Sequence, residues 1–296
     1  MKIHLIDGTY ELFRGFYGPP PKKAPDGREV GATIGLLRSL LALIKEAKVT
    51  HIGCAFDHEI ESFRNDLYGG YKTGEGIDPK LRAQFSLAEE AVTALGIVVW
   101  PMVEFEADDA IATATYRFKD APNVEQIVIC SPDKDLTQLV SGKRIVSWDR
   151  RREIIYDEKA VIEKYGVPPK SIPDYLALVG DSADGIPGIP AWGEKSTAAL
   201  LAKYGHIDDI PDDSEQYDLS TGRARRLAEN LLAYQEQAIL YRQLTTLRTD
   251  VPIKENLEDL EWRGARKEFK TFCNDLGIDF LIDQVPRWIT ETKLLI

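Results

Sequence analysis

Apolar strand-like runs alternate with segments of helical periodicity through the first half of this sequence. The strand-like runs are "KIHLIDG", "THIGCAFD", "IVVWPM" and "EQIVICSPDKD", and helical patterns lie between them at 31–48, 86–96 and 107–118. The segment 143–157 is expected to add a strand or a hairpin. Strands that alternate with helices favour a mostly parallel sheet flanked by helices. The sequence therefore predicts an α/β fold.

The pattern changes after "YGVPPKSIPDY". From about residue 171 only helical patterns follow, joined by turns rich in glycine and proline such as "GDSADGIPGIPAWG". We therefore expect an α/β domain over residues 1–167 and a helical domain over 168–250. The region 251–296 has no feature that the sequence alone lets us interpret.

The bulk composition limits the class of protein. The 296 residues are 44% hydrophobic and 29% charged, as in soluble globular proteins. No apolar run is long enough to span a membrane, and Asp7 interrupts the only apolar stretch near the start. Cys54 and Cys130 lie in apolar runs, which indicates buried, reduced thiols and a cytoplasmic protein. The net charge of −11 argues against a nucleic-acid partner unless many acids are committed to metal ions.

One stretch, "EFEADDAIATA", crowds four carboxylates against a helical pattern: Glu104, Glu106, Asp108 and Asp109. Acids in a first helical turn complement the helix dipole, and this alternative accounts for one or two of them. Other acids follow predicted strands or lie in the turns "SPDKD" and "GDSADG". Because the carboxyl ends of parallel strands share one edge of a sheet, we expect these acids to meet there. The candidate ligands are Asp7, Asp57, Glu106, Asp108, Asp109, Asp133, Asp135, Asp181 and Asp184.

Such a cluster requires cations or raised pKa values. Two unit charges 4 Å apart repel by about 4 kcal/mol at an effective dielectric near 20. Several such pairs would rival the whole stability of a domain, roughly 5–15 kcal/mol. Oxygen-only ligands suit Mg²⁺ or Mn²⁺, and none of the four histidines has ligand spacing. Taken singly, each strand-end aspartate could instead be a turn or cap residue. Taken together, they predict a metal centre.

Two other motifs fail on inspection. "LIDGT" resembles the DxDGT signature of aspartyl-phosphate phosphatases, but Leu5 occupies the nucleophile position. "GIPAWGEKS" resembles a phosphate-binding loop, but Glu194 separates the glycine from Lys195 and no strand precedes the motif.

A set of motifs in fixed order carries a resemblance: "LIDGTYELFR", "AFD", "SFRNDLYGGYK", "FEADDAIA", "SPDKDLTQL" and "GDSADGIPGIPAWGEKSTAALLAKYG". Over roughly residues 3–250 the chain resembles the bacterial 5′→3′ exonuclease/flap endonuclease family. That family includes the N-terminal exonuclease domain of bacterial DNA polymerases I. The resemblance implies a PIN-like α/β domain followed by a helical domain with a helix-hairpin-helix-type motif. The chain is too short to add a polymerase, so we expect a free-standing nuclease.

The resemblance implies a two-metal hydrolysis of phosphodiester bonds that leaves 5′-phosphates. One Mg²⁺ or Mn²⁺ would be held by Asp7, Asp57, Glu106 and Asp108, with Asp109 beside them. The second ion would be held by Asp133, Asp135, Asp181 and Asp184.

Basic residues match family positions that contact substrate phosphate: Arg14, Arg64 and Lys72. Lys72 is expected to stabilise the transition state, and the neighbouring Tyr71 is expected to contact DNA. Without the motif context each would be interpreted as a solvated surface charge. The segment of about 58–90 is expected to form an arch over the entering strand.

The hairpin "GIPGIPAWG" is expected to contact DNA. Gly185, Gly188 and Gly193 would let backbone N–H groups approach a phosphate, with Lys195 and Ser196 at the start of the next helix. A purely structural turn between helices is the alternative. The resemblance also implies that carbonyl oxygens of this loop could bind K⁺.

The sequence departs from the family where Glu75 stands in place of the expected arginine, where Gly185 replaces an asparagine, and at residues 190–193 in the hairpin. None of these changes removes a metal ligand. We therefore expect a monomeric nuclease that acts on DNA with 5′ flaps, nicks or free 5′ ends, or on RNA–DNA primer junctions. The alternatives are a non-catalytic structure-specific DNA-binding protein and a PIN-type ribonuclease.

Overall fold

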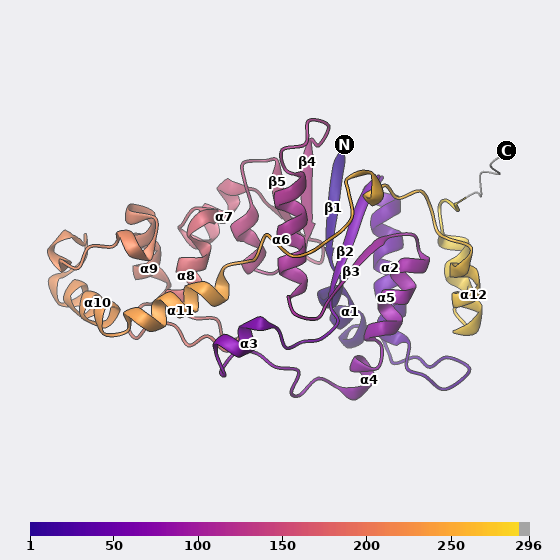
Figure 1. The fold of residues 1–296 in the computed structure, drawn as a ribbon, viewed down its shortest axis with the longest axis horizontal. Coiled ribbons are helices and arrows are strands. Elements are labelled where there is room, and N and C mark those ends of the chain that lie inside the picture. The colour runs from indigo at the N-terminus through magenta and orange to yellow at the C-terminus, as the bar shows by residue number, and fades with distance from the viewer. Residues whose placement is uncertain (290–296) are drawn as a thin grey trace. The chain divides into compact units, whose positions relative to one another are not determined.

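The computed structural model describes residues 1–289, and its contacts divide the chain into two compact units. The first unit comprises Met1–Ile60, Gly74–Cys130 and the chain from Asp250 onward. The second comprises Glu61–Thr73 and Ser131–Thr249. Both units are therefore discontinuous in sequence. The domains 1–167 and 168–250 stay a prediction. Figure 1 shows the labelled elements, and the two units are described separately below.

The first unit is built on parallel strands with the spatial order β3-β2-β1-β4. Apart from Lys2, every residue of β1 is buried, so its sequence "KIHLID" lacks the apolar–polar alternation of a half-exposed strand. Continuous burial is typical of parallel strands that helices cover on both faces. The strands are β1 (Lys2–Asp7), β2 (His51–Asp57), β3 (Val98–Met102) and β4 (Gln126–Cys130). The predicted mostly parallel α/β architecture is confirmed.

Three helices of the first unit follow the predicted helical patterns: α2 (Gly31–Glu46), α5 (Phe85–Ala94) and α6 (Ala107–Phe118). The unit also contains α1 (Gly8–Tyr17), α4 (Pro79–Arg82) and α12 (Glu268–Asp275), which the sequence analysis did not predict. Helices α1 and α2 cross closely because Gly15 faces Gly35. A Cβ on Gly35 would lie 2.6 Å from the Cα of Gly15, which is too close for any side chain.

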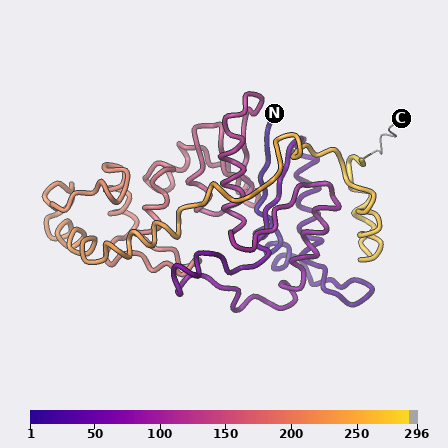
Figure 2. The backbone as a smooth tube through the Cα atoms, in the orientation of Figure 1, coloured from indigo at the N-terminus to yellow at the C-terminus, as the bar shows by residue number. Residues whose placement is uncertain are grey.

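The C-terminal segment, which the sequence left without an interpretation, completes the first unit. Trp262 donates its backbone N–H to Thr50 at 2.8 Å and its indole Nε1–H to Leu95 at 2.9 Å, in both cases to a carbonyl oxygen. The N–H of Val251 donates to Thr113 Oγ1 at 3.2 Å. The segment also contains 3₁₀ turns at Glu258–Leu260 and Asp279–Gln284. Figure 2 shows this yellow segment among indigo and purple parts of the chain. The last seven residues of the predicted region 251–296 lie outside the described residues.

The second unit is mainly helical and contains one hairpin. Strands β5 (Ile145–Asp149) and β6 (Ile154–Tyr156) pair antiparallel, which confirms the hairpin that the sequence offered as one possibility for 143–157. The helices are α3 (Phe63–Leu67), α7 (Glu158–Tyr165), α8 (Ile172–Val179), α9 (Glu194–Tyr204), α10 (Thr221–Ala233) and α11 (Gln235–Thr245). Shorter 3₁₀ turns lie at Asp135–Leu139, Pro169–Ser171, Ile207–Asp209 and Ser214–Gln216. An apolar cluster joins α7, α8, α9, α10 and α11 and includes Tyr71, which follows α3.

An ionic network fastens the helices of the second unit. Asp174 on α8 is buried, and its carboxylate lies 2.9 Å from His206 Nδ1 and accepts the N–H of Ile207 at 3.1 Å. Arg242 on α11 lies 3.5 Å from Asp174 and 2.8 Å from Asp208. One buried carboxylate therefore links α8, α11 and the chain after α9.

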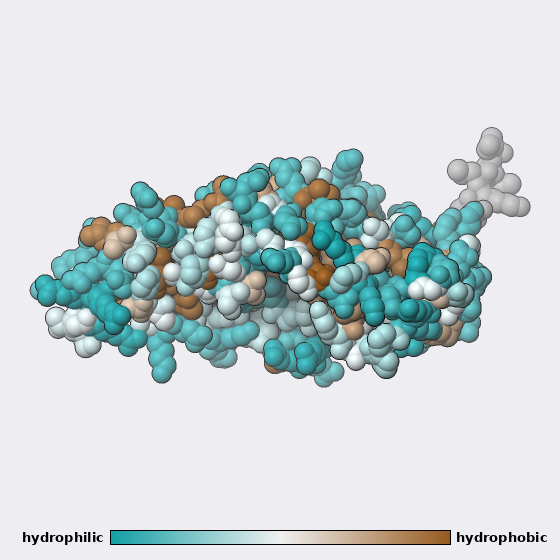
Figure 3. Space-filling view, turned by 90° about the horizontal axis from the view of Figure 1, so that it is seen from below, coloured by the Kyte–Doolittle hydropathy of each residue, from teal (hydrophilic) through white to brown (hydrophobic). Residues whose placement is uncertain are grey.

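Two further observations concern the predicted arch and the surface. Between residues 58 and 84 the chain forms only the short helices α3 and α4, and the arch over 58–90 stays a prediction. Figure 3 shows a mostly hydrophilic face with scattered apolar patches. Within residues 1–289, no helix combines the length and apolarity that crossing a membrane requires.

Candidate metal centre

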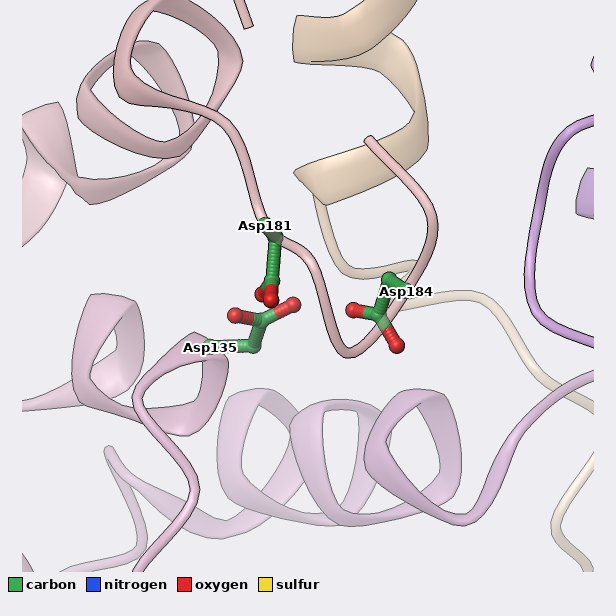
Figure 4. A group of neighbouring side chains, drawn as sticks. All are labelled: Asp135, Asp181 and Asp184. Carbon is green, nitrogen blue, oxygen red and sulfur yellow. The ribbon is translucent and has the colours of Figure 1, made fainter. Parts of the chain in front are cut away.

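Two loops of the second unit bring three aspartates together. After α8, reciprocal hydrogen bonds of 2.7 and 2.8 Å between the backbones of Asp181 and Ile186 close a tight loop. This loop positions Asp181 and Asp184. Asp135 follows the turn after β4 and begins a 3₁₀ turn. We call Asp135, Asp181 and Asp184 the aspartate cluster (Figure 4).

The geometry of the aspartate cluster suits a divalent cation. One carboxylate oxygen from each residue lies within 4.8 Å of the others, and the residues are only 7%, 2% and 9% exposed in chain order. Figure 4 shows the Asp135 carboxylate beside that of Asp181, with one oxygen facing Asp184. Asp135 Oδ1 is buried and has no hydrogen-bond partner. A buried acceptor without a donor is costly, and an all-oxygen donor set is what Mg²⁺ and Mn²⁺ prefer. These residues therefore fit such an ion.

The electrostatics of the aspartate cluster also favour a bound cation. Burial raises the pKa of Asp135 well above its ordinary value, and the negative charges of Asp133, Asp184 and Asp181 raise this pKa further. The ammonium group of Lys72 acts in the opposite direction. Without a cation, the surroundings of Asp135 thus stabilise its neutral form more than water does.

Two lysines pair with the aspartate cluster. Lys134 Nζ lies 2.7 Å from Asp181 Oδ1, and Lys72 Nζ lies 3.0 Å from Asp184 Oδ1. Burial lowers the pKa of Lys134, but the hydrogen bond with Asp181 and the nearby negative charges outweigh it, so the pKa is raised overall. The sequence analysis predicted Lys72 but missed Lys134. The available signal was a lysine between two acids in "DKD".

Asp133, predicted as a fourth ligand beside these three, lies outside the aspartate cluster. Its side chain is exposed, and its Oδ1 accepts the backbone N–H of Asp135 at 2.9 Å. Its own N–H donates to Ser131 Oγ at 3.1 Å. In this structure Asp133 shapes the turn that presents Asp135, and a role as a ligand stays a prediction.

The first unit places its predicted acids at the carboxyl edge of the parallel strands. Asp7 ends β1, and its Oδ1 accepts the N–H of Tyr10 at 2.8 Å, which caps α1. Asp57 ends β2, and its Oδ1 accepts the N–H of Ala107 at 2.7 Å, at the start of α6. The hydrogen bond from Ala107 brings the end of β2 to the start of α6, as the strand-end argument requires.

The crowded acids before α6 divide between two roles. Glu106 and Asp109 form a capping box, in which each side chain accepts the backbone N–H of the other residue. Asp108 lies half-buried in the first turn, and Glu104 is exposed. The helix-start alternative therefore applies to Asp108 and Asp109, which lie in the first turn, and Glu106 is the N-cap residue.

The predicted phosphate-binding arginines are both held by neighbouring groups. Arg64 is 1% exposed, and its Nε donates to the carbonyl oxygen of Leu244 at 2.7 Å, so here it packs inside the second unit. Arg14 is half-buried and donates to Glu11 at 2.5 Å and to Ser39 at 2.6 Å. Phosphate binding by either arginine stays a prediction.

The predicted DNA-binding residues differ in exposure. Tyr71 is buried in the apolar cluster of the second unit, and Lys72 Nζ lies 5.5 Å from its ring centre. Ser196 is also buried and receives a hydrogen bond from Arg223. Gly193 and Lys195 are exposed at the start of α9.

Backbone conformation and close backbone contacts require glycine at two positions of the hairpin. Gly185 has φ +74°, and a Cβ there would lie 2.1 Å from the Gly70 carbonyl oxygen. Gly188 has φ +73°, and a Cβ there would lie 2.5 Å from the carbonyl carbon of Val179. Positive φ and close backbone contacts thus require glycine without any ligand. Access to a phosphate at these two positions stays a prediction.

Comparison with known families accounts for this arrangement. Residues 2–166 match the family model described as 5′-3′ exonuclease, N-terminal resolvase-like domain. Residues 167–268 match the model described as 5′-3′ exonuclease, C-terminal SAM fold. The chain belongs to the 5′-3′ exonuclease family. The resemblance inferred from the ordered motifs is thereby confirmed.

Members of the exonuclease family differ in length. The chain is 34% identical over 287 residues to a 5′-3′ exonuclease of Aquifex aeolicus, covering 96% of this chain and 95% of that protein. It is 36% identical over 267 residues to DNA polymerase I of Rhizobium leguminosarum, covering 87% of this chain and 26% of the polymerase. The chain thus spans only about a quarter of that polymerase.

Among solved structures, the fold is similar to that of the bacteriophage T5 flap endonuclease, solved in a complex with DNA and metal ions. The TM-score is 0.66 at 17% identity, and the match covers 96% of each chain. At this identity the likeness supports the fold alone.

Proposed function

We propose that this chain is a metal-dependent, structure-specific 5′ nuclease that hydrolyses phosphodiester bonds of DNA, as a 5′→3′ exonuclease, a flap endonuclease or both. The observation that carries the proposal is the aspartate cluster, with its unpartnered Asp135 Oδ1, in a chain of the 5′-3′ exonuclease family. A relative described as a 5′-3′ exonuclease supports the proposal, and the fold is similar to that of a flap endonuclease solved with DNA and metal ions.

Two sets of carboxylates would each hold one Mg²⁺ or Mn²⁺. The aspartate cluster would hold one ion, with Asp133 fixing the turn before Asp135. The other ion would be held by Asp7, Asp57, Glu106 and Asp108, while Asp109 fixes the start of α6. When bound, such ions lower the pKa of a bound water and neutralise charge that develops on the phosphate.

The basic residues would hold the substrate. Lys72 carries a flexible, partly exposed ammonium group beside Asp184, so it can turn to a phosphate oxygen and stabilise developing negative charge. Glu11 and Ser39 would orient the Arg14 guanidinium for the same purpose. Gly193 and Lys195 would contact the backbone of the duplex, and carbonyl oxygens of the hairpin could bind K⁺.

The substrates that we propose are DNA with 5′ flaps, nicks or free 5′ ends, and RNA–DNA primer junctions. A 5′-flap duplex labelled at its 3′ end tests the proposal, with Mg²⁺ and then with EDTA. We expect cleavage near the junction with Mg²⁺, no cleavage with EDTA, and a loss of about a hundredfold or more in the Asp181→Asn variant. Asp212→Asn, an exposed change in the same unit, is the matched control and should cleave normally.

Two results would overturn the proposal. Tight binding of the flap without cleavage, in both Mg²⁺ and Mn²⁺, would favour a non-catalytic structure-specific DNA-binding protein. Cleavage of single-stranded RNA with the flap left intact would favour a PIN-type ribonuclease.

A further inference from the structure

Lys134 occupies the aspartate cluster in the way that a bound cation would. Its Nζ lies 2.7 Å from Asp181 Oδ1, a carboxylate whose side chain is only 1% exposed. The Lys134 side chain is 36% exposed. One end of this ion pair is therefore buried, while the side chain at the other end is partly exposed.

The backbone of Lys134 does not need to move for the ammonium group to leave. The carbonyl oxygen of Lys134 accepts hydrogen bonds from the N–H and the hydroxyl of Thr137, which anchor the residue at the start of the 3₁₀ turn. The flexible four-carbon side chain can then change rotamer with its backbone held.

The charges around the aspartate cluster oppose a divalent ion for as long as the Lys134 ammonium group stays beside Asp181. When all three carboxylates are ionised they carry three negative charges, and the ammonium groups of Lys134 and Lys72 supply two positive charges. A divalent ion beside Asp181 would lie within a few ångströms of the Lys134 ammonium group and repel it. A monovalent ion would bring no more charge than the lysine that it replaces.

We infer that Lys134 is a resident counter-cation of the aspartate cluster, displaced by a divalent ion and able to exclude monovalent ions. This inference rests on the proposed function, since it concerns the ion that the aspartate cluster would hold there. Lys134 is then a positioning residue: it keeps Asp181 and its neighbours assembled before the metal arrives. It also lowers the affinity for every divalent ion, because each must displace it.

Calorimetric titration of the metal-stripped protein with MnCl₂ alone, without DNA and at low ionic strength, tests the inference. Lys134→Met should bind Mn²⁺ about tenfold more tightly than the wild type, because the competing charge is gone. This change corresponds to about 1.4 kcal/mol of binding free energy. Replacing tetramethylammonium by K⁺ at constant ionic strength should weaken Mn²⁺ binding in Lys134→Met and leave the wild type unchanged.

Two further variants serve as controls for this titration. Lys203→Met removes an ion pair of 2.9 Å with Asp218 elsewhere in the same unit, and Mn²⁺ binding should not change. Lys134→Arg retains the charge and should stay close to the wild type, even if Lys134→Met proves hard to fold. Equal affinities in Lys134→Met and wild type would overturn the inference, as would tightening in Lys134→Arg as large as in Lys134→Met.

The Asp181→Asn variant separates this inference from the proposed function. If wild type and Asp181→Asn bind Mn²⁺ identically, the aspartate cluster holds no ion, and the proposed function is overturned together with the inference. If a site that depends on Asp181 is present but indifferent to Lys134, the inference alone is overturned.

Discussion

The Asp135→Asn variant should be more stable than the wild type without metal and less stable with it. Asn is close to Asp in shape but carries no charge, so the substitution removes one of three neighbouring negative charges. It also removes the carboxylate whose Oδ1 has no hydrogen-bond partner and which we propose as a metal ligand. Loss of the charge raises the free energy of unfolding without metal. Loss of the carboxylate weakens metal binding and so lowers the free energy of unfolding when metal is present.

The magnitude follows from the distances. Two unit charges 4.8 Å apart repel by about 3.5 kcal/mol at an effective dielectric near 20. Asp135 takes part in two such pairs, and the ammonium groups of Lys72 and Lys134 offset much of the repulsion. We therefore expect Asp135→Asn to raise the free energy of unfolding by about 2 kcal/mol at pH 8 in EDTA, which is about 4 °C or more in Tm.

The pH dependence has a definite sign. Burial and the neighbouring carboxylates raise the pKa of Asp135 above its ordinary value of 3.8, so the folded protein keeps this proton to a higher pH than the unfolded chain does. The metal-free wild type therefore loses stability as the pH rises from about 4 through the raised pKa. The Asp135→Asn variant lacks this titration, so its advantage should vanish below about pH 4.

Metal should reverse the order of stability. An ion present at about 100 times its Kd adds about 2.7 kcal/mol to the stability of a protein that binds it only when folded. Urea denaturation between pH 4 and 8, in EDTA and in Mg²⁺, measures both effects, with Asp212→Asn as the control. If Asp135→Asn without metal is less stable than the wild type at pH 8, the argument from repulsion between the three carboxylates is refuted. An unchanged order with Mg²⁺ would refute the assignment of Asp135 as a ligand.

Three further substitutions should lower the free energy of unfolding, as measured by urea denaturation. Arg64→Met should cost about 3 kcal/mol, because it leaves the buried Leu244 carbonyl oxygen without its donor; a cost near zero would show that the guanidinium is dispensable for packing. Asp174→Asn should cost about 2 kcal/mol, because it weakens the bonds to His206 and to two other groups; an unchanged unfolding midpoint would contradict this. Trp262→Phe should cost about 1 kcal/mol through loss of the indole hydrogen bond; full stability would show that the C-terminal segment is not fastened there.

The sequence was most informative where local chemistry decides the structure. Asp7 and Asp57 end buried strands, and parallel pairing necessarily places both at the same edge. A helix start after the crowded acids was also foreseen as an alternative, although the capping box of Glu106 and Asp109 was not. Periodicity and strand-end position depend on near neighbours in the chain, so both are visible without a structure.

The remaining features depend on long-range contacts. The pairing of Lys134 with Asp181 exists because a backbone loop after α8 turns one carboxylate back toward the "DKD" turn. Arg64 is buried by contacts with a carbonyl oxygen 180 residues away in sequence. Such partners have no periodic signal, and a motif that fixes the residue type does not say whether a charge faces solvent or a carbonyl group.

The way in which the first unit is assembled affects how the chain is made. Residues after Asp250, including Trp262, complete a unit whose strands end at Cys130. A ribosome adds about 5–20 residues per second, so roughly 130 residues of intervening chain delay this closure by on the order of 10 s. Meanwhile the nascent α/β layer lacks the indole that bonds to Leu95, while most of the second unit is already available to fold. Premature termination anywhere between residues 131 and 249 would therefore release an open α/β layer, a natural substrate for chaperones and proteases.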